Sequence, residues 1–126
     1  MSAFVRFSVV GAIGAVLQIA LIAAMTKSGL PAVAATPVAV EIAILHNFLW
    51  HEKFTWRERR STTAGARLWK FHASNGAVSL VGNTLLMYGL ADRLRIASTL
   101  AGVIAIAVCA LINFRIADRW VWTVEP

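Results

Sequence analysis

Charged residues are scarce in this chain, and long stretches lack them altogether. Asp, Glu, Lys and Arg make up 14% of its 126 residues, against about 25% in an ordinary soluble domain. None of the four occurs in residues 7–26, 71–91 or 96–114, and each stretch reaches the roughly 20 residues needed to cross the bilayer core. These stretches have no polar face at helical period, which disfavours a soluble four-helix bundle.

Groups that carry out chemistry are also few. Cys109 is the single cysteine and has neither a second Cys nor a nearby His, so we interpret it as a small packing residue rather than a redox or metal ligand. His46, His51 and His72 are scattered over different parts of the chain, and we expect ordinary polar partners for them. The sequence shows no nucleophile with a base, no glycine-rich phosphate loop and no paired carboxylates. We therefore expect a protein that is not an enzyme and that has no metal or cofactor.

The chain repeats its own pattern after 66 residues. Asn47–Trp56 aligns with Asn113–Trp122, and both copies run Asn-Phe, then an acid-base pair, then aromatic-x-Trp. Before each Asn, every fourth position is a small residue. These residues are Ala35, Ala39 and Ala43 in one copy and Ala101, Ala105 and Cys109 in the other. Pro37 and Glu41 interrupt the apolar stretch 32–50. Because this stretch aligns with the uninterrupted 96–114, we predict that it also spans the membrane.

Four apolar stretches predict an all-α integral membrane protein. Its four transmembrane helices form a parallel duplication of a two-helix unit within a single membrane domain, residues 1–126. Repeat one covers about 4–56, a basic cytoplasmic loop about 52–69, and repeat two about 70–122.

The basic residues predict the orientation. Of the 12 Lys and Arg residues, nine lie near the termini and in the central loop, and three lie in the two short outer loops. The positive-inside rule therefore places both termini in the cytoplasm. The net charge of +6 could suggest nucleic-acid binding, but the basic residues flank the spans, so no nucleic acid is expected as a partner.

Two motifs connect the chain to a known family. The opening Arg6-Phe7 with Gly11, its restart at Lys70-Phe71 with Gly76, and the doubled Asn-Phe motif resemble the GtrA-like family of small four-helix membrane proteins. The likeness covers about residues 4–122. It implies a multi-pass protein of the bacterial cytoplasmic (inner) membrane that acts in polysaccharide synthesis. The implied task is translocation, or flipping, of a polyprenyl-phosphate-linked sugar, or support of a membrane glycosyltransferase.

A few polar residues lie deep in the predicted spans. Gln18 and Asn83 correspond to each other in the two copies, and both interhelical hydrogen bonding and a place in a polar substrate path remain open for them. Glu41 lies roughly 15 Å inside the cytoplasmic end of its span, near mid-bilayer. Its repeat partner is Ala107. We expect Glu41 to line the path, to bind a coupling proton, or to stay protonated and hydrogen-bonded to a neighbouring helix.

Basic and amide residues gather with aromatic residues at the cytoplasmic rim. An interfacial aromatic belt and attraction to anionic lipids explain part of this pattern. The sharper hypothesis is that basic residues surround the binding site of the lipid phosphate, with two amides that fix the helix ends and meet the sugar. The basic residues are Arg6, Lys53, Lys70, Arg115 and Arg119, and the amides are Asn47 and Asn113.

Three functions remain open at this point. A translocase of a lipid-linked sugar ranks first, and a scaffold that recruits or stabilises a glycosyltransferase ranks second. A small cation or drug exporter that uses Glu41 ranks third, because such exporters usually carry their carboxylate in the first span, where this chain has Gln18. Four helices enclose little space, so we expect a homo-oligomer with the path at a subunit interface or along a groove that faces lipid.

Overall fold

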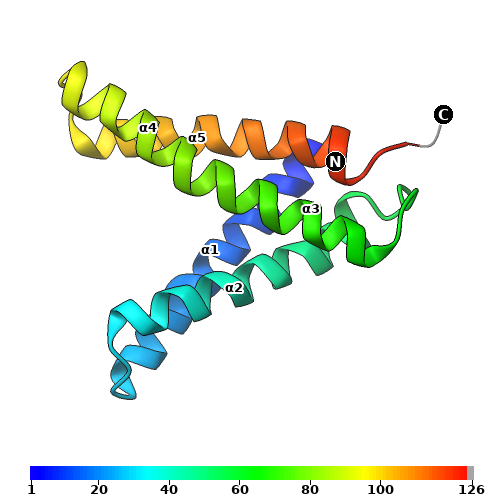
Figure 1. Cartoon of the computed structure of the whole chain (residues 1–126), viewed down its shortest axis with the longest axis horizontal. Helices are drawn as coiled ribbons and strands as arrows, with labels where there is room; N and C mark the ends of the chain where they lie inside the picture. The colour runs from blue at the N-terminus through cyan, green and yellow to red at the C-terminus, as the bar shows by residue number, and fades with distance from the viewer. Residues whose placement is uncertain (125–126) are drawn as a thin grey trace. The chain divides into compact units, whose positions relative to one another are not determined.

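The computed structural model describes residues 1–124, and every regular element within that range is helical (Figure 1). The predicted all-α membrane fold is therefore confirmed. The η segments are π-helical. In chain order the elements are α1 (Ala3–Lys27), α2 (Ala32–Trp50), η1 (His51–Thr55), α3 (Ala64–Ala77), η2 (Val78–Gly82), α4 (Asn83–Met87), η3 (Tyr88–Arg93), α5 (Ser98–Ile116) and η4 (Ala117–Val121).

The chain divides into two compact units, each of which contains one copy of the repeat. The first unit is Met1–Glu58, and the second begins at Arg59. In the first unit, α1 and α2 pack side by side as an antiparallel hairpin (Figure 1). In the second unit, the continuous helical run from α3 to η3 packs against α5 in the same way. Each unit is thus the two-helix hairpin that short connections between long helices predict.

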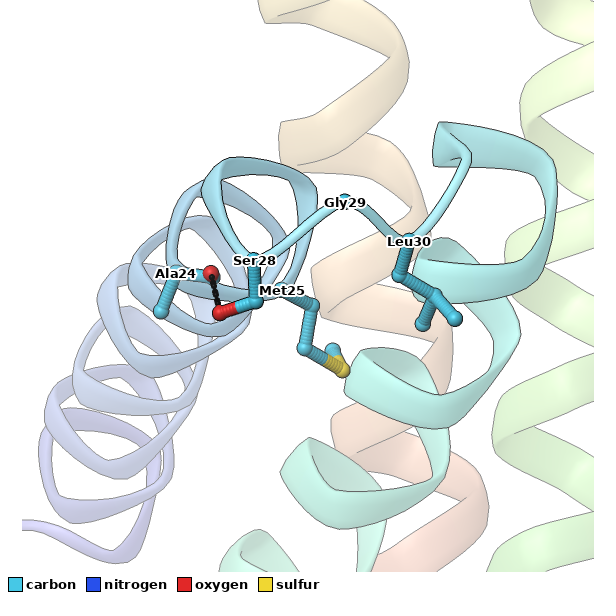
Figure 2. Close-up of a pocket in the computed structure, with 5 residues that line it drawn as sticks. All are labelled: Ala24, Met25, Ser28, Gly29 and Leu30. Carbon is cyan, nitrogen blue, oxygen red and sulfur yellow. Dashed lines mark hydrogen bonds between the residues drawn. The ribbon is translucent and has the colours of Figure 1, made fainter.

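The turn between α1 and α2 is determined by local residues. Ser28 Oγ donates a hydrogen bond to the Ala24 carbonyl at 3.0 Å, which satisfies one of the last carbonyls of α1 (Figure 2). Gly29 has φ +97°, a conformation that residues with a Cβ rarely adopt, and Pro31 then caps the start of α2. The turn encloses an open hollow of about 500 Å³ lined by Ala24, Met25, Ser28, Gly29 and Leu30. Met25 and Leu30 extend to the same side of the turn, whereas Ser28 folds back onto its own helix (Figure 2).

The small-residue stripes are buried in both units, as the repeat predicts. Ala35 and Ala39 have no exposed surface, and their equivalents Ala101 and Ala105 are 0% and 1% exposed. Small side chains let neighbouring backbones approach closely, which favours helix association in lipid, where the hydrophobic effect between helices is weak. The duplication in sequence is therefore also a duplication in packing.

Cys109 continues the stripe of the second unit and is buried. Its thiol donates to the Val78 carbonyl at 3.7 Å, at the start of η2. A Cβ placed on Gly82, at the end of η2, would lie only 3.1 Å from Cys109 Sγ. These contacts confirm that Cys109 is a packing residue, set against a glycine on the facing helix.

Within residues 1–124, three helical segments are long and apolar enough to cross a membrane: Ala3–Lys27, Ala32–Thr55 and Ser98–Val121. The second contains Pro37 and is nevertheless one unbroken helix, which confirms the prediction made from the repeat. The predicted span 71–91 lies within the helical run α3–η3, where π-helical segments alternate with α-helix. Large apolar side chains remain exposed along these helices, as expected for surfaces that face lipid. They include Ile13, Val16, Ile19, Val33, Leu80, Leu85, Val103 and Ile106.

Candidate functional site

A π-helical segment ends the second long helix of each unit. In the first unit, the Trp56 N–H donates to the His51 carbonyl at 2.9 Å, and in the second unit the Trp122 N–H donates to the Ala117 carbonyl at 2.9 Å. Both segments lie at equivalent positions of the repeat, 66 residues apart. The wider i→i+5 turn changes which side chains face the neighbouring helix, and π-helical segments often occur at functional sites.

The segments η1 and η4 each present an aromatic ring to a cation from the first helix of their unit. Arg6 Nη1 donates to the Phe54 carbonyl at 3.3 Å, and its guanidinium carbon lies 5.3 Å from the centre of the Phe54 ring. In the second unit, Lys70 Nζ donates to the Trp120 carbonyl at 3.4 Å and lies 5.5 Å from the Trp120 ring centre. Both distances permit a cation–π interaction. We call these two arrangements the Arg6 site and the Lys70 site.

A buried aromatic pair supports each cation. Phe7 lies next to Trp56, with ring centres 5.9 Å apart and planes at 59°, and Phe71 lies next to Trp122, at 5.4 Å and 62°. Each Phe directly follows the cation in sequence, so its burial fixes where the helix presents that cation. We did not assign Phe7 and Phe71 to the site from the sequence. The sequence signal that could identify them is the repeated basic-Phe pair, because a bulky aromatic side chain next to a predicted ligand has to pack against its surroundings.

The Arg6 site has a further polar residue that the Lys70 site lacks. His51 is 1% exposed, and its Nδ1 lies 2.9 Å from the Thr55 hydroxyl. Its ring stacks on Phe7, with centres 4.9 Å apart and planes at 10°. The equivalent residue in the second unit is Ala117. For His51, the prediction of an ordinary polar partner is confirmed.

Arg6 also keeps hydrogen-bonding capacity in reserve. A guanidinium has five N–H donors, and Arg6 Nε is buried without a hydrogen-bond partner among the residues that the structure describes. Most buried polar atoms are hydrogen-bonded, so an unsatisfied donor on the Arg6 guanidinium itself is notable. The donor can serve an anion that binds at this position.

The two predicted asparagines occupy different surroundings. Asn47 packs against Gly14 of α1 so closely that a Cβ at Gly14 would lie 2.7 Å from Asn47 Cγ. Its Oδ1 also lies 3.2 Å from His46 Nδ1. Asn113 Oδ1, by contrast, is buried and has no hydrogen-bond partner within residues 1–124. The first amide therefore packs at the contact between α1 and α2, whereas the acceptor of the second has no protein partner within the described residues.

The remaining predicted basic residues lie apart from the two cation–aromatic contacts. Lys53, Arg115 and Arg119 have exposed side chains on η1, the last turn of α5 and η4, respectively. In the second unit, Arg59 Nη1 lies 2.6 Å from Asp118 Oδ1, so this carboxylate next to Arg119 is paired with a cation of the central loop. The basic rim is thus partly neutralised by its own acid and otherwise exposed.

The deep polar residues divide between the units. Gln18 on α1 is half-buried, and Asn83 at the start of α4 is half-buried within its own unit. Glu41 is exposed on α2, on the opposite side of that helix from the buried Ala43. Their participation in a substrate path stays a prediction. Among the described residues there is no group of three or more His, Cys, Asp or Glu that could hold a metal ion.

Comparison with known proteins identifies the family. The GtrA/DPMS transmembrane domain matches residues 6–122, and the chain belongs to this family. It is also similar to a protein named dolichol-phosphate mannosyltransferase from Pyrococcus furiosus, with 37% identity over 76 residues. That match covers 59% of this chain and 22% of the relative, so it concerns a small part of the longer protein. The predicted resemblance is confirmed, and the chain is a multi-pass membrane protein.

Proposed function

We propose that this chain translocates a polyprenyl-phosphate-linked sugar across the membrane for cell-surface polysaccharide synthesis. The observation that carries the proposal is the duplicated cation–aromatic contact, Arg6 with Phe54 and Lys70 with Trp120, in a member of the GtrA/DPMS family. The similarity to a dolichol-phosphate mannosyltransferase supports a lipid-phosphate sugar as the chemical class.

The chemistry of both cations suits a phosphate. Arg6 and Lys70 each donate to one backbone carbonyl at 3.3 to 3.4 Å, which is longer than an ordinary hydrogen bond. A guanidinium has five N–H donors and an ammonium has three, so most donors of both side chains remain available. Charge-assisted hydrogen bonds to phosphate are shorter and about twice as strong as neutral ones. A lipid phosphate at the rim would thus accept hydrogen bonds from N–H groups that make only long hydrogen bonds within the protein.

Movement of the sugar requires polar partners along the way. Removal of an anion and several hydroxyls from water costs several kcal/mol or more unless side chains replace the lost hydration. In each unit a half-buried amide in the predicted span would serve this task, Gln18 in the first and Asn83 in the second. Asn113 Oδ1 adds a buried acceptor without a partner in the described part of the chain, which suits a sugar hydroxyl. Glu41 supplies an ionisable group for coupling or for binding.

A second function is favoured by one specific observation. The Pyrococcus furiosus relative is named as a mannosyltransferase, and the matched segment is 22% of its length. The alternative function is therefore a membrane scaffold that recruits or stabilises a glycosyltransferase. Under this alternative, the large exposed apolar side chains would include the contact surface for the enzyme.

Reconstituted vesicles separate these two functions. Purified chain in vesicles should move a polyprenyl-phospho-sugar between leaflets without any enzyme, and Arg6→Gln with Lys70→Gln should slow this movement at least tenfold. Lys27→Gln is the matched control, because it removes one cation from the other end of α1. Absence of transport by the unaltered chain, together with stable co-purification of a glycosyltransferase, would replace translocation by scaffolding.

A further inference from the structure

An apolar groove runs along the first unit beside the Arg6 site. It has a volume of about 280 Å³, and residues of α1, α2 and η1 form its walls. The lining residues are Val9, Val10, Ile13, His46, Trp50 and Phe54. All of them belong to the first unit, so the groove exists within that hairpin alone.

The lining of the groove suits hydrocarbon. Five of its six residues are apolar or aromatic, and the sixth, His46, already has Asn47 Oδ1 within 3.2 Å of its Nδ1. Sites for drug-sized molecules measure about 300 to 1,000 Å³, so this groove accepts a short piece of a hydrocarbon chain rather than a whole lipid. The remainder of a long chain would extend into the bilayer along the exposed side chains of Ile13 and Val16.

The groove and the Arg6 cation share the Phe54 ring. Phe54 forms part of the groove wall, and the same ring carries the Arg6 guanidinium at 5.3 Å from its centre. Val9 and Val10 follow Arg6 by one turn of α1, so the apolar wall begins where the charged side chain ends. An occupant must therefore carry a negative charge at one end, followed immediately by hydrocarbon.

We propose that the groove holds the first isoprene units of a polyprenyl phosphate whose phosphate binds Arg6. In such a lipid, one ester oxygen joins the phosphorus directly to the first carbon of the hydrocarbon chain. In a phospholipid, glycerol and two carboxylic esters separate the phosphate from the hydrocarbon, and in the lining only the Trp50 indole and the His46 ring carry an N–H for those esters. The proposal rests on the proposed function for the ligand class, and it adds the location of the chain end that lies next to the phosphate.

The second copy of the repeat predicts a weaker hold on the chain. Counted from the basic-Phe pair, the positions of Val9 and Val10 are occupied by Ala73 and Ser74. These residues are smaller, and one of them is polar. We therefore assign the prenyl-binding groove to the first unit and expect the Lys70 site to contact mainly the headgroup.

Native mass spectrometry of the purified full chain with farnesyl phosphate tests this assignment. We expect Ile13→Trp, which fills the groove, and Arg6→Gln, which removes the charge, each to weaken farnesyl phosphate binding about tenfold. Ala77→Trp introduces the same side chain at an exposed position of the second unit and should leave binding unchanged. Farnesol and dodecanoyl phosphatidylglycerol should compete poorly, because each lacks one half of the recognised group.

A second readout protects the test against misfolded variants. A farnesyl phosphate with a diazirine on its second isoprene unit should label residues 9–13 or 46–54 of the unaltered chain. Labels confined to the second unit, equal competition by phosphatidylglycerol, or unchanged binding by folded Ile13→Trp would each overturn the proposal. Farnesyl phosphate binding that follows these expectations in a chain without transport activity would refute translocation and leave the groove assignment intact. Transport without groove labelling would refute the groove assignment and leave translocation intact.

Discussion

Substitution of Gly14 tests how tightly the first hairpin is packed. The side chain of Asn47 occupies the space above Gly14, and a Cβ there would lie 2.7 Å from Asn47 Cγ. Real Cβ atoms do not approach a neighbour this closely, so Gly14→Ala must displace either Asn47 or one of the helices. Displacement would also break the 3.2 Å contact between Asn47 and His46.

The magnitude follows from two opposing effects. Overpacking of this kind costs typically 1–3 kcal/mol, and loss of a hydrogen bond inside a membrane protein adds about 0.6 kcal/mol. Replacement of Gly by Ala in a helix stabilises by about 1 kcal/mol on its own. Gly11→Ala isolates this last effect, because a Cβ at Gly11 meets no atom within 4 Å. We therefore expect Gly14→Ala to be less stable than Gly11→Ala by about 2 kcal/mol, or about 30-fold in the folding equilibrium.

Reversible unfolding in mixed detergent and SDS micelles, followed by far-UV circular dichroism, measures this difference. Gly82→Ala should give an intermediate loss, because its Cβ would lie 3.1 Å from Cys109 Sγ. The double variant Gly14→Ala, Asn47→Ala should recover most of the crowding cost, since the smaller side chain leaves space for the new methyl group. A difference between Gly14→Ala and Gly11→Ala below about 0.5 kcal/mol would refute the packing argument.

Two further predictions concern topology and the acid in α2. A single cysteine introduced as Thr62→Cys in a Cys109→Ser background should resist an impermeant maleimide in intact cells and react after the cells are opened, because the basic loop is predicted to be cytoplasmic. Labelling from outside would show that the loop is extracellular and that the predicted topology is wrong. Glu41→Gln should reduce transport at least tenfold with little loss of folded protein, whereas Glu41→Ala should also lower stability by about 1 kcal/mol. Normal transport by Glu41→Gln, measured across pH, would make Glu41 a structural residue.

Much of the fold is readable from the pattern of the residues. The absence of charge in long stretches predicts helices that cross a membrane, because every backbone polar group must be satisfied internally in lipid. The 66-residue repeat predicts that Ala35 and Ala101 share one environment, and both are fully buried. It also predicts that a proline-containing segment is a span, since its uninterrupted copy is one. These inferences succeed because periodicity and composition are properties of the chain itself.

The candidate site is only partly predictable in this way. Arg6 and Lys70 stand out as basic residues just before the charge-free stretches 7–26 and 71–91, but nothing in their spacing indicates that they lie over Phe54 and Trp120. That contact depends on the π-helical segments η1 and η4, and no sequence motif predicts their hydrogen-bond pattern. It also depends on how two helices distant in sequence are aligned along their length.

Composition, charge and the internal repeat alone determine that this is a helical membrane protein of two similar halves, because lipid imposes the same requirements on every residue of a span. Only the tertiary structure shows that a groove lies beside Arg6 and that, within residues 1–124, Asn113 Oδ1 has no hydrogen-bond partner. Asn47 and Asn113 are the same residue type at the same position of the repeat. Asn47 nevertheless packs over Gly14, and such a contact arises from packing between helices rather than from any property of the asparagine.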